Sequence, residues 1–156
     1  QYMSSDHEEV RSVISILSDK FPECEECMKA QEVGNALYGL RNMSSDVAEV
    51  RRLVSVLTKM TRDCKEPMDV QQLSMACHGI HRLSSDHPES LEALAAIIEK
   101  MRICKQLFGA QCISNVLCGL HGMSSEHQEV RNTLQILHKK IRECPEAMTR
   151  HDVLNA

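Results

Sequence analysis

Histidine and cysteine side chains occur in two pairs whose spacing suits metal binding. His78 and His81 form one pair, and Cys118 and His121 form the other at the equivalent place 40 residues later. Imidazole nitrogens and thiolates are common zinc ligands, and four of them complete a tetrahedral site. Neighbouring packed helices, however, have axes about 10 Å apart. We therefore predict that these pairs are too far apart to share a metal ion.

The chain has eight cysteines among its 156 residues. Cys24-x-x-Cys27 occurs once and has no second pair, so it is a weak redox or zinc motif. A cysteine also recurs every 40 residues within an apolar pattern, at Cys24, Cys64, Cys104 and Cys144. Equivalent positions on neighbouring helices are too far apart for a disulfide. We expect small buried side chains there, and free thiols in this number favour an intracellular reducing compartment.

The phrase Ser-Ser-Asp-His at residues 4–7 holds the residue types of a hydrolytic triad. Adjacent residues at one helix start cannot adopt the geometry of a triad. The sequence also lacks a Gly-rich phosphate loop and a recognisable pair of catalytic carboxylates. We therefore predict a protein that is not an enzyme and that uses no cofactor.

The same phrase shows how the elements are organised. Two serines and an acidic residue recur along the chain, with the first serine at Ser4, Ser44, Ser84 and Ser124, which gives a period of 40 residues. A fixed period of this length is typical of a repeat architecture. We predict one array over residues 1–156, with units at 1–40, 41–80, 81–120 and 121–156.

Each unit has two segments with helical periodicity. In the first unit the apolar residues of the first segment are Val10, Val13, Ile14, Leu17, Phe21 and Cys24, and those of the second are Val33, Ala36, Leu37, Leu40 and Met43. Each unit is too small to hold a core alone, and stacking would supply one. The prediction is an all-α fold, an α-solenoid of four stacked helix–turn–helix repeats of 40 residues.

Polar residues mark the expected helix starts. Ser-Ser-Asp, or Ser-Ser-Glu in the fourth unit, precedes the first helix of each unit, and we expect one of the serines to be the N-cap. Asp69 with Gln72, and Thr149 with Asp152, have the spacing of a capping box before the second helix. A large apolar residue precedes each second helix with hydrophobic-staple spacing, namely Met28, Met68, Phe108 and Met148.

Glycine recurs late in the second helix, at Gly39, Gly79 and Gly119. Glycine there costs about 1 kcal/mol relative to alanine. Either the helix ends at this residue or another backbone comes close to it. The apolar pattern continues beyond the glycine, so we favour the close approach.

Two segments resemble the second helix of octotricopeptide repeats and the related heptatricopeptide repeats, which contain a Pro-Gln-acidic-Leu-x-Asn-x-Leu-Trp-Ala-Leu run. They are residues 30–43 and 110–123, and the matching residues are Gln31, Val33, Asn35, Leu37 and Leu40, then Gln111, Ile113, Asn115, Leu117 and Leu120. These families are α-solenoids that mostly bind organellar RNA. The resemblance therefore implies single-stranded RNA as a partner, and a mitochondrial or chloroplast location.

The second helices also carry a polar face beside their apolar stripe. Its predicted ligand-binding residues are Gln31, Asn35, Tyr38, Asn42, Gln71, His78, Arg82, Gln111, Asn115 and Cys118, and the fourth unit adds His151 and Asn155. Amide and guanidinium groups can pair with base edges, while Tyr, His and Arg can stack on bases. The alternative is that the asparagines and glutamines make hydrogen bonds between units. Tyr38, His78 and Cys118 differ from one unit to the next and are more typical of specificity positions than Asn35 and Asn115 are.

The charge of the chain leaves two kinds of partner open. The 18 Lys and Arg residues and 22 Asp and Glu residues give a net charge of −4. The first unit alone has 3 basic and 8 acidic residues. Because RNA binders usually have a basic excess, a protein–protein scaffold or an accessory subunit of a large complex stays the alternative to RNA. We expect no membrane span, and the lack of a polar capping helix at either end favours a segment of a longer array.

Overall fold

The computed structural model describes residues 3–150, and these form seven α-helices, two short 3-10 helices and no strand. The all-α prediction is confirmed. The elements are α1 (Glu8–Lys20), η1 (Phe21–Glu23), α2 (Ala30–Gly39), η2 (Leu40–Asn42), α3 (Ala48–Asp63), α4 (Val70–Gly79), α5 (Pro88–Ile103), α6 (Ala110–Gly119) and α7 (Gln128–Arg142).

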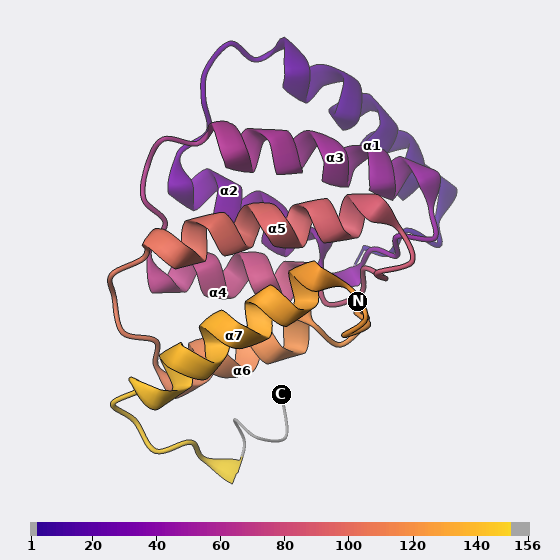
Figure 1. The fold of residues 1–156 in the computed structure, drawn as a ribbon. Helices are drawn as coiled ribbons and strands as arrows, with labels where there is room; N and C mark the ends of the chain where they lie inside the picture. The colour runs from indigo at the N-terminus through magenta and orange to yellow at the C-terminus, as the bar shows by residue number, and fades with distance from the viewer. Residues whose placement is uncertain (1–2, 151–156) are drawn as a thin grey trace.

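The helices pack in two layers (Figure 1). In the first, which we call the A layer, α1 packs against α3, α3 against α5, and α5 against α7. In the second, the B layer, α2 packs against α4 and α4 against α6. Apolar residues from both layers form one buried core between them. Helices of consecutive 40-residue units therefore lie side by side in each layer.

The expectation that a serine of Ser-Ser-Asp caps the first helix is wrong. The N-cap residues are His7, Val47, His87 and His127, and none of these side chains makes a capping hydrogen bond. The first serine instead accepts from the N–H two residues later, as Ser44 Oγ does from Asp46 at 3.2 Å. The phrase is thus a turn before the helix.

The second serine of the phrase is buried and binds to the next unit. Ser5 Oγ accepts from Ser44 N–H at 3.0 Å, Ser45 Oγ from Ser84 N–H at 2.8 Å, and Ser85 Oγ from Ser124 N–H at 2.9 Å. Three hydrogen bonds at one spacing explain why the phrase recurs. Sequence reasoning missed this role because a serine before a helix is usually its cap.

The second helices are capped from the following unit. The carboxylates of Glu66 and Glu146 accept from the N–H groups of Ala30 and Ala110 at 2.9 and 2.8 Å, and the side chain of Gln106 accepts from Val70 at 3.0 Å. These bonds satisfy first-turn N–H groups that have no partner inside the helix. The predicted box of Asp69 and Gln72 is confirmed in both directions, whereas Asp152 of the second predicted box lies outside the described residues.

The recurrent glycines allow close contact within the B layer. A Cβ on Gly79 would lie 2.0 Å from the carbonyl oxygen of Leu37, and one on Gly119 would lie 2.3 Å from that of Cys77. A Cβ on Gly39 would meet no atom within 4 Å. None of the described glycines has a positive φ, so close approach, rather than backbone conformation, requires glycine at the two inner positions. Each glycine is also the last residue of its helix.

The apolar residues in the loops between the two helices of a unit are buried in the second and third units and more exposed in the first. The staple residues Met68 and Phe108 are 2% and 0% exposed. Cys64 and Cys104 are buried as predicted, but Cys24 is exposed and Cys144 is half-buried. The prediction for Cys24 is wrong, because its side chain lies exposed at a pocket between the loop after η1 and α3. Within residues 3–150 no helix is long and apolar enough to cross a membrane.

Candidate functional site

The outward side of the B layer carries the predicted polar face. The described residues that were predicted for this face are all at least partly accessible. The exposed ones are Gln31, Asn35, Gln71, Arg82 and Gln111, and the half-buried ones are Tyr38, Asn42, His78, Asn115 and Cys118. They come from α2, α4 and α6 and from the segments that follow these helices. His151 and Asn155 lie outside the described residues.

Four side chains at the ends of α2 and α4 form a cluster that we call the stacking cluster: Tyr38, Arg41, His78 and His81. The guanidinium carbon of Arg41 lies 4.5 Å from the centre of the Tyr38 ring. The Tyr38 and His78 ring centroids are 5.7 Å apart, and those of His78 and His81 are 5.3 Å apart. The cluster therefore joins two consecutive units through ring contacts.

Local hydrogen bonds hold the outer two members of the cluster. The Arg41 guanidinium donates to the carbonyl oxygen of Tyr38 at 3.3 Å, and Nδ1 of His81 lies 2.9 Å from the carbonyl oxygen of His78. Tyr38 and His78 were predicted for the polar face, His81 was noted only for its spacing from His78 as a possible metal ligand, and Arg41 was missed. The signal that could have placed Arg41 and His81 in the cluster is the spacing of three residues, which places side chains on one side of a helical turn.

The cluster favours a neutral His78. Burial lowers the pKa of His78 below its ordinary value, and the nearby positive charges of His81 and Arg41 lower it further. The Nδ1 atom of His78 is buried and has no hydrogen-bond partner within the described residues. A neutral imidazole between the rings of Tyr38 and His81 adds little charge to the cluster.

The asparagines and glutamines of the polar face divide between the two roles considered from the sequence, which are ligand binding and hydrogen bonding between units. The side-chain amide of Asn115 donates to the hydroxyl of Ser74 at 2.6 Å, which joins α6 to α4. This bond supports a structural role for Asn115. The glutamines Gln31, Gln71 and Gln111 each occupy the second residue of a B-layer helix and are exposed. They form a row of amides along the layer.

Cys118 lies at the same place in its unit as Tyr38 and His78 do in theirs. It is half-buried, and burial raises the pKa of its thiol. The thiol is therefore protonated at neutral pH and is a poor nucleophile and metal ligand. Within residues 3–150 no group of three or more His, Cys, Asp or Glu side chains is placed to hold a metal ion.

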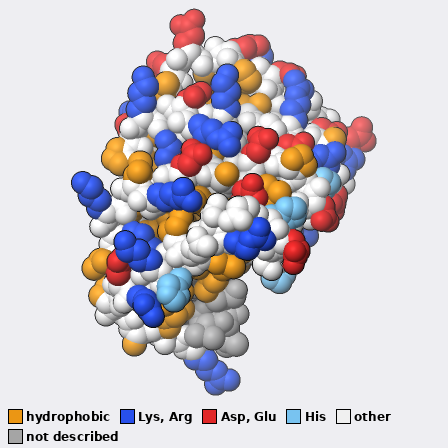
Figure 2. All heavy atoms as spheres, viewed as in Figure 1, with side chains coloured by type: hydrophobic (Ala, Val, Ile, Leu, Met, Phe, Trp, Pro, Cys, Tyr) orange, Lys and Arg blue, Asp and Glu red, His pale blue; other side chains and the backbone are white. Residues whose placement is uncertain are grey.

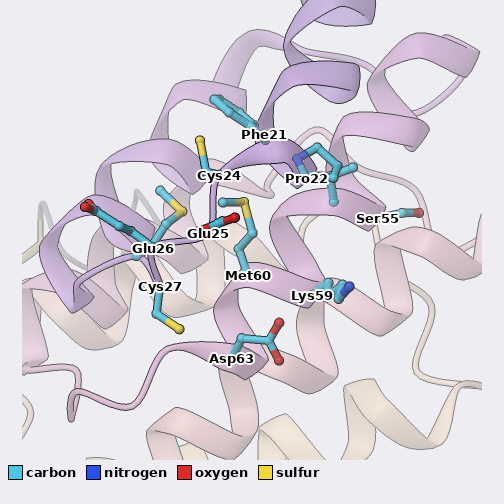
Figure 3. Close-up of a pocket in the computed structure, with 12 residues that line it drawn as sticks. Phe21, Pro22, Cys24, Glu25, Glu26, Cys27, Ser55, Lys59, Met60 and Asp63 are labelled. Atoms are coloured by element: carbon cyan, nitrogen blue, oxygen red, sulfur yellow. The ribbon is translucent and has the colours of Figure 1, made fainter.

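The Cys24-x-x-Cys27 motif lines a pocket of about 340 Å³ between the loop after η1 and α3. Figure 3 shows the two side chains pointing away from each other, Cys24 toward Phe21 and Cys27 toward Asp63. Both cysteines are exposed, and all eight cysteines of the chain are free. The two thiols do not form a joint site in this arrangement.

The A layer presents a different surface. Figure 2 shows Lys and Arg side chains interspersed with Asp and Glu on the face formed by α3, α5 and α7. Exposed ion pairs such as Lys20 with Glu23 and Lys139 with Glu143 belong to this kind of surface, and they contribute little to stability. The side chains that could bind a ligand by stacking and hydrogen bonding are thus more concentrated on the B layer.

Comparisons with known protein families, with curated proteins and with solved structures find no match to this chain. The resemblance of its second helices to octotricopeptide repeats stays a prediction.

Proposed function

We propose that the chain is a non-catalytic binding module that presents its B layer to single-stranded RNA. In this proposal the two layers are an α-solenoid of four 40-residue repeats, and the B layer is its ligand surface. The stacking cluster is the observation that carries the proposal. It provides accessible rings of Tyr38 and His78, with the cationic side chain of Arg41 against one of them. Unpaired bases stack on such rings.

The surroundings of the cluster suit RNA in two ways. The exposed glutamines of the B-layer helices supply amide groups that both donate to and accept from base edges. Arg41 and Arg82 follow two successive B-layer helices and provide positive charge for phosphate groups. Contact between a base and an aromatic side chain contributes about 1 to 3 kcal/mol per base. We therefore expect most of the affinity to come from stacking at the cluster.

Net charge limits this affinity. With a net charge of −4, the chain as a whole gains little from neutralising phosphates, which usually dominates binding to nucleic acids. The same charge favours a second candidate function, a scaffold that binds a protein partner. The eight free thiols fit either function in a reducing compartment, such as the interior of an organelle.

Titration of fluorescently labelled single-stranded RNA, followed by anisotropy at physiological salt, tests the proposal. We expect binding by the wild-type chain and a loss of affinity of at least about fivefold for Tyr38→Ala, as removal of one stacked base predicts. His138→Ala is the matched control, because His138 is an exposed residue of α7 in the A layer, and its affinity should equal that of the wild type.

Two results would count against RNA. One is wild-type binding no tighter than about 10⁻⁴ M, the range of weak non-specific association. The other is an equal affinity for the Tyr38→Ala and His138→Ala variants. Either result would leave the protein scaffold as the better supported function.

A further inference from the structure

A pocket with an excess of positive charge lies between the third and fourth units. It has a volume of about 540 Å³ and is formed by the end of α5, the loop that follows it, and α7. Its charged residues are Arg102, Lys105, Lys139, Lys140 and Glu143. Four cations and one carboxylate give the pocket a net charge of +3, whereas the whole chain has a net charge of −4. We call it the basic pocket.

Most cations of the basic pocket are exposed and weakly paired. Arg102 and Lys105 are exposed and make no hydrogen bond or ion pair within the described residues. Lys139 lies 4.0 Å from Glu143 and its side chain is 77% exposed, so this ion pair is weak. Figure 2 shows Lys and Arg side chains gathered over the ends of α5 and α7, at the lower left of the view. A hollow lined mainly by one sign of charge concentrates ions of the opposite sign.

Lys140 is the half-buried cation of the pocket, and contacts with the preceding unit hold it in place. Its Nζ donates to the carbonyl oxygens of Cys104 and Gln106 at 3.0 and 3.5 Å, and it lies 4.7 Å from the centre of the Phe108 ring. An ammonium group has three N–H donors, so these two bonds leave one for a ligand. A side chain that is already ordered loses little conformational entropy when a ligand binds.

The positive charge belongs to this pair of units and is not a general property of the repeat. An equivalent pocket of about 340 Å³ lies between the first and second units. The residues that replace Arg102, Lys105 and Lys140 there are Pro22, Glu25 and Met60. One lysine and three carboxylates line that pocket and give it a net charge of −2. The same fold thus forms one acidic and one basic pocket.

The opening of the basic pocket does not depend on α7 being the last described helix. The residues equivalent to Lys139 on α3 and α5 are Lys59 and Glu99, and both are exposed although another A-layer helix packs after each. A helix packed after α7 in the same way would leave Lys139 accessible. Arg102 and Lys105 are exposed with the fourth unit already in place.

We propose that the basic pocket binds the diphosphate group of a small molecule. A phosphate group carries about −1.5 to −2 charges at pH 7, so two linked groups match a net charge of +3 better than one does. The guanidinium of Arg102 can donate to two phosphate oxygens side by side. The three lysines supply point charges around them.

The size and place of the pocket support a small ligand that is separate from the RNA surface. A volume of about 540 Å³ is typical of pockets for small molecules and leaves space for the group that carries the diphosphate. Gln135 and Ile136 supply an amide and an apolar contact for that group. None of the lining residues belongs to a B-layer helix.

Isothermal titration calorimetry with sodium pyrophosphate, at neutral pH and low ionic strength, tests the proposal. Low ionic strength is needed because dissolved salt screens exposed charges. We expect the wild-type chain to bind one pyrophosphate with a Kd below about 1 mM. Arg102→Ala should weaken binding at least about tenfold, as loss of a charge-assisted hydrogen bond predicts. Lys140→Met, which copies the residue of the acidic pocket, should have a similar effect, and circular dichroism verifies that both variants are folded.

Lys59→Ala is the matched control, because Lys59 is an exposed lysine of the acidic pocket. This variant loses one positive charge, as Arg102→Ala does, so the two chains have the same net charge. The affinity of Lys59→Ala for pyrophosphate should equal that of the wild type. An equal loss of affinity in both variants would mean that pyrophosphate responds only to overall charge, and that result would overturn the proposal.

Two further ligands identify the chemistry and the source of the bound group. Inorganic phosphate should bind at least about tenfold more weakly than pyrophosphate, because it fills fewer of the donors, and an equal affinity would overturn the assignment of two linked groups. ADP that binds more tightly than pyrophosphate would identify a nucleoside diphosphate as the source, and the reverse order would identify the free anion. A wild-type chain that binds none of the three below about 1 mM would overturn the site. These titrations contain no RNA, so their outcome is independent of the test of the proposed function.

Discussion

Gly79 and Gly39 occupy the same place in two units but have different surroundings, so the pair tests the close packing of the B layer. In Gly79→Ala the new Cβ would lie 2.0 Å from the carbonyl oxygen and 2.5 Å from the carbonyl carbon of Leu37. These are backbone atoms of α2, which cannot rotate away as a side chain could. In Gly39→Ala the new Cβ meets no atom within 4 Å.

The structure sets the size and sign of the two effects. Relief of the contact at Gly79 requires α4 to move away from α2, and overpacking of this kind costs about 1 to 3 kcal/mol or more. Alanine returns up to about 1 kcal/mol in a helix relative to glycine, and the benefit is smaller at a last helical residue. We expect a net loss of about 2 kcal/mol for Gly79→Ala, and a gain of at most about 1 kcal/mol for Gly39→Ala.

Thermal unfolding followed by circular dichroism measures the difference. For a chain of this size, 1 kcal/mol shifts Tm by about 2 to 4 °C. Gly79→Ala should therefore lower Tm by about 4 to 8 °C, while Gly39→Ala leaves it unchanged or slightly higher. Gly119→Ala should behave like Gly79→Ala, because its Cβ would lie 2.3 Å from a carbonyl oxygen. Equal shifts for Gly39→Ala and Gly79→Ala would refute the reasoning.

Three further predictions follow from hydrogen bonding, ionisation and burial. Ser85→Ala removes the acceptor of an inter-unit hydrogen bond and should lower the free energy of unfolding by about 1 to 3 kcal/mol in urea titrations, whereas Ser125→Ala, at an exposed serine, should change it little. Because the pKa of His78 is lowered in the folded chain, this side chain binds a proton more readily in the unfolded chain. The stability contributed by neutral His78 should therefore be present above about pH 6.5 and decline as the pH falls below it, and a His78→Gln variant should show a smaller decline in Tm. Burial raises the pKa of Cys112 to about 12, so a thiol reagent at neutral pH should modify exposed Cys24 quickly and Cys112 only on unfolding; equal rates in the native state would contradict the described burial.

The helical pairs and their apolar sides could be predicted from the sequence because both depend on local periodicity. The stripe from Val10 to Leu17 and the Asp69 box are local patterns. The role of Ser45 could not be predicted, because its bond is to Ser84, and single-unit patterns do not show which group the next unit brings. The exposure of Cys24 could not be predicted either, because it depends on how the loop after η1 lies against α3 and not on the local apolar pattern.

The candidate site was predictable in part. Tyr38 and His78 could be predicted because they lie on the polar side of the second helices and differ from one unit to the next. Their contact could not be derived, since ring separation depends on how closely α2 and α4 approach, and that distance is set by Gly79. Arg41 was missed, and His81 was considered only as a metal ligand, because both lie outside the polar stripe predicted from the sequence.

The hydrogen bonds described above between units join residues about one unit apart in sequence. Those of the serines span 39 residues, those that cap the B-layer helices span 36, and the bond of Asn115 spans 41. Each such contact closes a loop of nearly the same length, so the entropy lost on closure is similar for every unit. Folding can begin at any pair of neighbouring units and extend from there, and during unfolding the end units should open before the middle of the chain.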